Sequence, residues 1–294
     1  RELKESGVPD AFKYLMMQES SFKGGAVSRS NAVGFWQFKK ATAEEYLLQI
    51  NNSVDERKNV ISSTRAAAAY FKKSNRYLKS WMYSLLSFHD GLGGVRRQWS
   101  GNPYFARNTM VVNKDSHYYP VHFLAHYFAF RDAYTLAKAL KSSEIYLLEY
   151  TVDLIDNVKD LSEFIAEKSK IDPSKIYNDI MKYNPWVLGE TVPVWGSNQK
   201  FCYSMVIPIY QAQKELFITN LKDFACNGKV RSSSNYFYKD SIQQAYPYVM
   251  ELESKEDIYT EVYINGINGI KLSKDIELKE LRGHFKIKKL VKLN

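Results

Sequence analysis

The segment of residues 19–43 places the strongest constraint on how this chain folds. It opens with Glu19, four residues after Leu15 and eleven after Val8, so a helix puts this carboxyl group on the same face as apolar side chains. A carboxylate on such a face is unfavourable unless it is paired or protonated. A protonated carboxyl group in an apolar cleft is suited to act as a general acid. The residues alone also allow a second interpretation, in which Glu19 ends its helix and points to solvent.

Apolar spacing and capping residues predict that the first 140 residues are mainly helical. One helix starts near Pro9 and Asp10, and Ser62 or Ser63 is the predicted N-cap of a second. A third helix has its apolar stripe at residues 81–88 and is broken by the glycines at 91–94. The aromatic residues from 119 onward predict a fourth helix that runs towards residue 140.

Between these helices lies a series of short motifs that is unlike a generic helical sequence. The motifs combine hydroxyl-bearing, glycine and aromatic residues in a fixed order. They are Glu19-Ser20-Ser21-Phe22, Ala26-Val27-Ser28, Ala32-Val33-Gly34-Phe35-Trp36-Gln37-Phe38, Asp55-Glu56-Arg57, Ser87-Phe88-His89-Asp90-Gly91 and Asp115-Ser116-His117-Tyr118-Tyr119.

This series resembles the signature of lytic transglycosylases with a goose-type-lysozyme-like catalytic domain, and in particular the branch known as murein transglycosylase D. The resemblance implies that residues 1–140 form a lysozyme-like domain that cleaves peptidoglycan glycan strands without a metal or organic cofactor. It implies that Glu19 is the catalytic acid and then the base. The substrate-binding residues that it implies are Ser20, Ser28, Gly34, Gln37, Phe88, His89 and Tyr119.

Structural roles remain open for several of these residues. Ser28 also suits the cap of a turn, Gly34 a special loop conformation, and Tyr119 a packing position on its aromatic stripe. Where the family has Tyr-Asn, this chain has Phe88-His89, which loses a hydroxyl group and introduces a side chain that can carry positive charge. A cationic His89 would oppose the acid role of Glu19 by favouring its carboxylate.

The presence of a single acid favours a mechanism in which the substrate itself provides the nucleophile. Residues 20–42 contain no Asp or Glu, whereas ordinary glycosidases use two carboxyl groups. The resemblance implies that the muramyl C6 hydroxyl attacks C1, so that cleavage of the bond between N-acetylmuramic acid and N-acetylglucosamine leaves a 1,6-anhydro end. Two alternatives stay open: a muramidase that lets water attack the same bond, and a non-catalytic peptidoglycan-binding or scaffolding protein.

The pattern changes after residue 141. A strand at 146–154, two helices, and a closing strand at 201–207 are predicted, with the second helix opening at Asp172-Pro173 and ending at Asn184. This order resembles a degenerate LysM module, a small glycan-binding domain, over residues 141–210. Residues 211–294 are predicted to be partly β, including 258–264 and 285–287, and are otherwise unassigned. The predicted fold class is therefore α+β, with three regions: 1–140, 141–210 and 211–294.

The composition and the spacing of charged and apolar residues limit which kinds of partner are expected. The net charge is +9, but the basic residues are scattered and do not form a nucleic-acid-binding pattern. No run of about 18 apolar residues predicts a membrane span, and no apolar stretch follows Arg1 to indicate a signal peptide. His122 and His126 have zinc-protease spacing, but Phe123 stands where that motif needs Glu, so no metal is predicted.

The expected partner is peptidoglycan, which implies a location in the bacterial cell envelope, on the periplasmic side. An envelope protein partner is a further expectation for residues 211–294. The two cysteines at positions 202 and 226 fit either one disulfide or two buried thiols.

Overall fold

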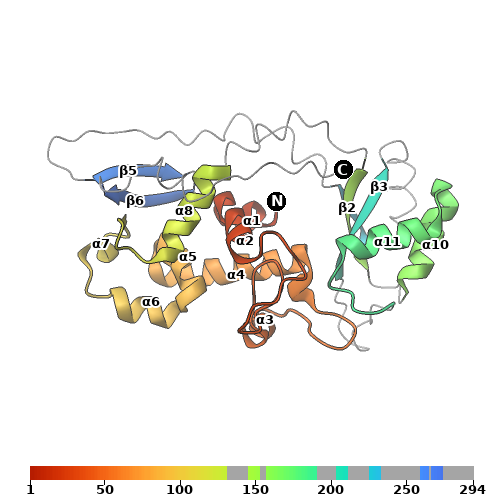
Figure 1. Cartoon of the computed structure of the whole chain (residues 1–294), viewed down its shortest axis with the longest axis horizontal. Coiled ribbons are helices and arrows are strands. Elements are labelled where there is room, and N and C mark those ends of the chain that lie inside the picture. Colours follow the sequence, from red (N-terminus) through yellow and green to blue (C-terminus); the bar gives the residue numbers. More distant parts are fainter. Residues whose placement is uncertain are drawn as a thin grey trace. The chain divides into compact units, whose positions relative to one another are not determined.

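The computed structural model describes residues 1–130, 145–152, 157–190, 203–210, 225–232, 259–264 and 266–273 (Figure 1). The chain forms two compact units. The first contains Arg1–Gln18, Ala68–Leu140 and Ala245–Asn294, and the second contains Glu19–Ala67 and Lys141–Gln244. The unit boundaries after Gln18 and Ala67 fall within the residue ranges of helices α2 (Lys13–Ser20) and α4 (Val60–Leu78). The predicted division into regions 1–140, 141–210 and 211–294 stays a prediction.

Aromatic rings form the core of the first unit. The buried ring of Phe12 lies edge-on to the rings of Phe71, Trp81 and Phe123, with centroid distances of 4.7, 5.8 and 5.9 Å. Edge-to-face pairs of this kind add about 0.5–1.5 kcal/mol each to the free energy of burial. They join the short helix η1 to three longer helices. The helices of this unit, besides parts of α2 and α4, are α1 (Glu2–Glu5), η1 (Asp10–Phe12), α5 (Trp81–Asp90), α6 (Leu92–Trp99), α7 (Pro103–Ala106) and α8 (Tyr118–Phe130).

The predicted third and fourth helices are confirmed as α5 and α8. Gly91 ends α5 with a φ of 75°, a backbone conformation that glycine adopts without steric cost. The other two glycines of the 91–94 cluster lie inside α6, so Gly91 alone breaks the helix. The predicted extension of the fourth helix beyond Phe130 falls outside the described residues.

The first unit also contains a small sheet with two strands from late in the sequence. Strand β6 (Ile267–Ser273) pairs in parallel with β1 (Met110–Val112) and antiparallel with β5 (Tyr259–Ile264). Figure 1 shows β5 and β6, in blue, near α8 although they are distant in sequence. Of these strands only β5 was predicted, because β1 has three residues and β6 is interrupted by Gly269. The predicted strand at 285–287 lies outside the described residues.

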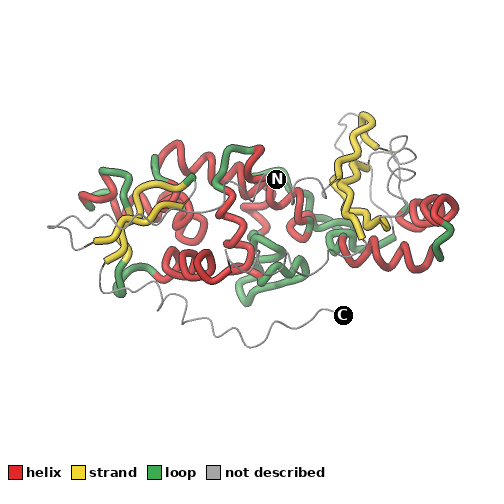
Figure 2. Tube along the Cα trace, turned by 90° about the horizontal axis from the view of Figure 1, so that it is seen from above, coloured by secondary structure: helices red, strands yellow, loops and turns green. Residues whose placement is uncertain are grey.

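The second unit contains the predicted order of strand, helix, helix and strand: β2 (Ile145–Val152), α10 (Val158–Ser169), α11 (Pro173–Tyr183) and β3 (Tyr203–Tyr210). Figure 2 shows the two helices beside the strands, and β2 pairs antiparallel with β3. Helix α11 begins as predicted, because the Asp172 side chain accepts a hydrogen bond from the Lys175 N–H.

Strand β3 was predicted to stop before Pro208, and this boundary is wrong. Pro208 pairs with Leu147 inside the strand. The order of the described sheet is β3-β2-β4, so β3 lies at an edge, where a residue without an N–H group is tolerated. Strand β4 (Ala225–Ser232), which was not predicted, comes from the unassigned region and pairs with β2.

The strand–helix–helix–strand module shares one core with the segment around residue 54. Val54 is fully buried among Trp186, Val187 and Ile207, and it forms an isolated β-bridge with Val187. The Asp55 N–H donates to the Trp186 carbonyl at 2.8 Å. Helix α3 (Lys40–Glu45) and the short helix η2 (Glu56–Lys58) complete this part of the unit. Within the second unit, module and segment are therefore a single packed body.

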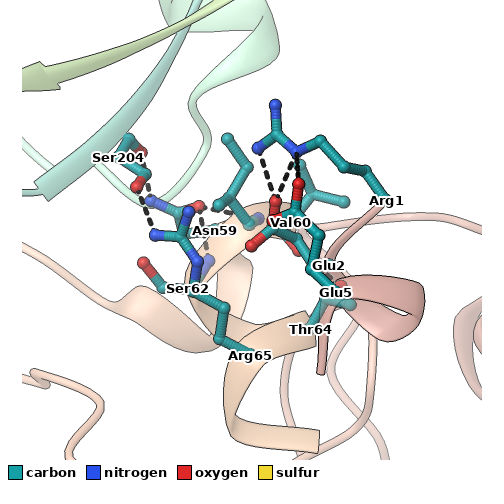
Figure 3. Close-up of polar contacts among 10 residues, drawn as sticks. Arg1, Glu2, Glu5, Asn59, Val60, Ser62, Thr64, Arg65 and Ser204 are labelled. Atoms are coloured by element: carbon teal, nitrogen blue, oxygen red, sulfur yellow. Dashed lines mark hydrogen bonds and ion pairs between the residues drawn. The ribbon is translucent and has the colours of Figure 1, made fainter. Parts of the chain in front are cut away.

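Asn59 fastens α4 to the module. Its Oδ1 atom accepts hydrogen bonds from the N–H groups of Ile61 and Ser62, so Asn59, and not Ser62 or Ser63 as predicted, caps the helix. Its Nδ2 atom donates to the Ser204 carbonyl at 2.7 Å. Arg65 Nη1 donates to the Ser204 hydroxyl at 2.8 Å, and Figure 3 shows Asn59 and Arg65 both pointing toward Ser204.

Replacing Asn59 with Ala is expected to destabilise the fold by about 2–3 kcal/mol, because it removes a helix cap and leaves the buried Ser204 carbonyl without its donor. Urea unfolding monitored by circular dichroism measures the change. An unfolding midpoint equal to that of the wild type would mean that water replaces both interactions at no cost.

No helix among the described residues is long and apolar enough to cross a membrane.

Candidate functional site

Glu19 lies in the last turn of α2. Its side chain is half-buried, whereas Leu15, one turn earlier, is fully buried. The helix ends directly after it, because Ser21 and Phe22 both adopt left-handed backbone conformations, with φ of 53° and 60°. Such conformations cost about 1–2 kcal/mol for a residue with a Cβ atom, and strain of this kind is often found at functional sites. Glu19 therefore stands at an abrupt change from helix to loop.

Ser20 ties the end of α2 to the loop that follows. Its hydroxyl donates to the carbonyl of Phe35 at 2.9 Å, and the side chain is 8% exposed. The hydroxyl thus has a partner within the protein, and the contact fixes the residue next to Glu19 against the loop.

Ser28 closes a turn in this loop. Its Oγ atom accepts a hydrogen bond from the Ala32 N–H at 3.0 Å, and its own N–H donates to the Ala32 carbonyl at 2.9 Å. Val33 then forms β-bridges with Val27 and Phe38. Ser28 has the turn-capping role that the sequence left open.

Gly34 and Gln37 lie at the centre of the loop. Gly34 has a φ of +88°, and a Cβ atom at this position would lie 1.8 Å from the Arg57 carbonyl oxygen. Gln37 Nε2 donates to the carbonyls of Gly34 and Ala26, at 2.9 and 3.2 Å. Both amide N–H donors of Gln37 are therefore used within the loop, and its amide oxygen is the atom that can accept a hydrogen bond from a ligand.

A buried ion pair lies in the segment that packs against Gly34. Arg57 Nε and Nη2 donate to the two carboxylate oxygens of Asp55 at 2.9 and 2.8 Å, and both residues are less than 10% exposed. Paired contacts of this geometry are among the strongest charge-assisted hydrogen bonds. The sequence identified these residues as part of a motif but not as the support of Gly34, because no local pattern reveals which backbone atom a distant glycine approaches.

Glu56, between the members of this ion pair, is a buried acid of the second unit. Burial raises its pKa above the ordinary value of 4.5, although the hydrogen bond from the Gln49 N–H, the hydrogen bond with Ser62 and the positive charge of Arg65 lower it. Burial also raises the pKa of Tyr203 to about 12, and the negative charge of Glu56 adds to this shift. The site around Glu56 therefore disfavours its carboxylate.

Replacing Glu56 with Gln is expected to make the melting temperature less dependent on pH. A raised folded-state pKa means that the folded chain holds the Glu56 proton more tightly than the unfolded chain. This stabilisation is complete below pH 4.5 and is lost as the pH rises through the folded-state pKa. The melting temperature of the variant should therefore rise relative to that of the wild type between pH 4.5 and 8. Differential scanning calorimetry measures the melting temperatures. A difference between variant and wild type that stayed constant with pH would contradict the raised pKa of Glu56.

The other predicted site residues lie in the first unit. Phe88 packs against the rings of Tyr70 and Phe71, with centroid distances of 5.2 and 5.0 Å, so the ring retained at this position has a packing role. Tyr119 is 2% exposed, and its carbonyl accepts a hydrogen bond from Gln18 Nε2 at 3.3 Å. The Tyr119 ring centroid lies 5.0 Å from that of His89.

His89 belongs to a polar cluster that the sequence did not predict. Its Nδ1 atom lies 2.5 Å from Asp90 Oδ1, and its Nε2 atom forms a hydrogen bond with the Tyr118 hydroxyl. His117 Nε2 lies 3.6 Å from the other carboxylate oxygen of Asp90. His122 and His126 lie on α8 outside this cluster, and burial lowers the pKa of His126.

The predicted site residues thus fall into two sets. Residues 19, 20, 28, 34 and 37 belong to the second unit, and residues 88, 89 and 119 to the first. In the second unit the structure joins Glu19 through Ser20 to one well-bonded loop that contains Ser28, Gly34 and Gln37.

Comparison with known proteins shows similarities for the first part of the chain. Residues 1–111 match the family model described as the transglycosylase SLT domain, a range that includes every predicted site residue except Tyr119. The chain is 28% identical over 109 residues to the membrane-bound lytic murein transglycosylase D of Escherichia coli strain K12, which is 37% of this chain and 24% of that protein. It is 31% identical over 97 residues to a protein named for tributyltin chloride resistance from Alteromonas sp. strain M-1, which is 33% of this chain and 47% of the relative.

The matches confirm the predicted similarity to lytic transglycosylases for the N-terminal part of the chain. The matched segment spans less than half the length of either relative.

Proposed function

We propose that this chain is a peptidoglycan lytic transglycosylase in which Glu19 is the single acid and base. The observation that carries the proposal is the position of Glu19: half-buried in the last turn of α2, beside a loop held by internal hydrogen bonds, and within the residues that match the SLT domain. A neutral carboxyl group is the form that donates a proton.

The proposed reaction has two proton transfers. Glu19 first donates its proton to the oxygen that links N-acetylmuramic acid to N-acetylglucosamine, and the bond from that oxygen to the muramyl C1 breaks. Positive charge develops on C1 and the ring oxygen. The Glu19 carboxylate then accepts the proton of the muramyl C6 hydroxyl, whose oxygen bonds to C1 and closes the 1,6-anhydro ring. Glu19 ends protonated, and no water is consumed.

The contacts within the loop support different roles for the neighbouring residues. Ser20, Ser28 and Gly34 hold the loop in shape through the bonds and the close approach described above. Gln37 offers an amide oxygen to a sugar hydroxyl or amide N–H, and we propose it as a direct substrate contact. A substrate contact by His89 stays a separate prediction. We propose a packing role for Phe88 and Tyr119.

We also propose that the strand–helix–helix–strand module is LysM-like and binds glycan. Weak binding by a module attached to the catalytic region would raise the local concentration of substrate. The proposed location is the bacterial cell envelope on the periplasmic side, since peptidoglycan lies there. The described strands of the 211–294 region pair with strands of the two units, and an envelope protein partner for this region stays a prediction.

Release of soluble glycan fragments from purified peptidoglycan sacculi tests the proposal. The wild-type chain is expected to solubilise the sacculi in a buffer that contains a chelator. Binding to the sacculi, measured by co-sedimentation, without any release of fragments would reject the enzyme and favour a peptidoglycan-binding scaffold.

A further inference from the structure

We propose that His89, Asp90 and His117 form a binding site for a divalent transition-metal ion, with zinc as the best-fitting ion. His89 and Asp90 are the last two residues of α5, and His117 directly precedes α8. One possible ligand atom from each residue lies within 4.8 Å of the others. Among the described residues, these three form the group of His, Cys, Asp or Glu side chains that lie close enough together to hold a metal ion. Two imidazole nitrogens and one carboxylate oxygen are a ligand set typical of zinc.

The distances suit capture of an ion by small side-chain rotations. Asp90 lies between the two imidazoles, with one carboxylate oxygen 2.5 Å from His89 Nδ1 and the other 3.6 Å from His117 Nε2. Tetrahedral zinc with bonds of about 2.0–2.2 Å needs ligand atoms about 3.3–3.5 Å apart. If Asp90 binds through Oδ2, its distance of 3.6 Å from His117 Nε2 is already close to this value, and His89 Nδ1 would have to leave Oδ1 to reach the ion.

Neighbouring groups orient both imidazoles. If His89 binds through Nδ1, its Nε2–H group donates to the Tyr118 hydroxyl, the kind of outer contact that commonly fixes a metal-binding histidine. His117 Nδ1 now accepts a hydrogen bond from the Tyr119 N–H at 3.2 Å, and metal binding at Nε2 would move a proton to Nδ1 and break it. Tyr119 is 2% exposed, so the loss of this hydrogen bond opposes metal binding and lowers the affinity.

The site is open to solvent. The side chains of His89, Asp90 and His117 are 38%, 18% and 23% exposed, so an ion has an entry path and a fourth coordination position for water or a ligand. His89 stands where the family pattern has Asn. The inference therefore concerns this chain, and it holds or fails independently of the proposed glycan chemistry.

Isothermal titration of the full, tag-free chain with zinc chloride tests the proposal. After removal of metals by a chelator and dialysis, we expect one zinc ion per chain with a micromolar dissociation constant. His89→Asn and His117→Ala should each weaken binding by at least about tenfold, the loss typical when an important metal contact is removed. His122→Ala, which removes an exposed histidine from the adjacent helix, should bind like the wild type.

A second measurement on the wild type covers the case in which a variant does not fold. Addition of Co²⁺ should give visible absorption typical of nitrogen and oxygen ligands in a tetrahedral site, and zinc should remove it. The proposal is overturned by a wild-type chain that binds neither ion saturably, or by folded His89→Asn and His117→Ala variants that retain wild-type affinity.

Discussion

Replacing Glu19 with Gln is expected to reduce the release of fragments from peptidoglycan by about 10²–10⁴-fold, the usual contribution of a general acid. Gln has nearly the same shape as Glu but cannot donate a carboxylic proton or accept one from the C6 hydroxyl. Because Glu19 is half-buried in the last turn of α2, the isosteric change should leave the fold intact. Fragment release at equal protein concentration, with melting temperature measured in parallel, gives the result.

Glu44→Gln is the matched control for this loss. Glu44 lies in α3 of the same unit and is exposed, and its contact with Lys40 at 3.8 Å is a surface pair of little energetic value. This variant should release fragments at the wild-type rate. A Glu19→Gln chain that kept wild-type activity would mean that another group donates the proton.

Replacing Gly34 with Ala is expected to destabilise the fold by about 4 kcal/mol or more, a loss that single substitutions rarely reach. Two effects combine. The left-handed φ of +88° is unfavourable for a residue with a Cβ atom, and that atom would lie 1.8 Å from the Arg57 carbonyl oxygen. Arg57 cannot move away easily, because its guanidinium group is paired with Asp55 in a buried position. Urea unfolding measures the change in stability.

Gly25 provides the control for this substitution. It belongs to the same loop, but a Cβ atom added there meets nothing within 4 Å. Gly25→Ala should therefore change stability by less than about 1 kcal/mol. If Gly34→Ala were as stable as Gly25→Ala, the close approach of Gly34 to Arg57 would be wrong.

The sequence predicted elements whose signals are local. The Asp172-Pro173 start of α11, the end of α5 at Gly91 and the order of strand, helix, helix and strand each depend on residues within a few positions of one another. The cap of α4 was assigned to the wrong residue. Asn59 both caps the helix and donates a hydrogen bond to the Ser204 carbonyl, 145 positions away in the sequence, and no local pattern reveals that second contact. Strands β1, β4 and β6 are short or contain glycine, and pairing with distant strands defines them.

In the candidate site, too, the sequence pointed to individual residues but not to the contacts between distant ones. Resemblance to a known family directed attention to Glu19, Gly34 and Gln37, but it did not reveal the hydrogen bonds that give Ser20 and Gln37 their partners in the loop. The cluster formed by His89, Asp90 and His117 depends on a contact between α5 and the segment before α8, which no motif spacing encodes.

The mass of the fragments that the wild-type chain releases from purified peptidoglycan tests the central claim most directly. Attack by the C6 hydroxyl predicts fragments that end in 1,6-anhydro-N-acetylmuramic acid, and their absence when Glu19→Gln is used. Fragments heavier by one water, with reducing N-acetylmuramic acid ends, would contradict the account and identify a muramidase.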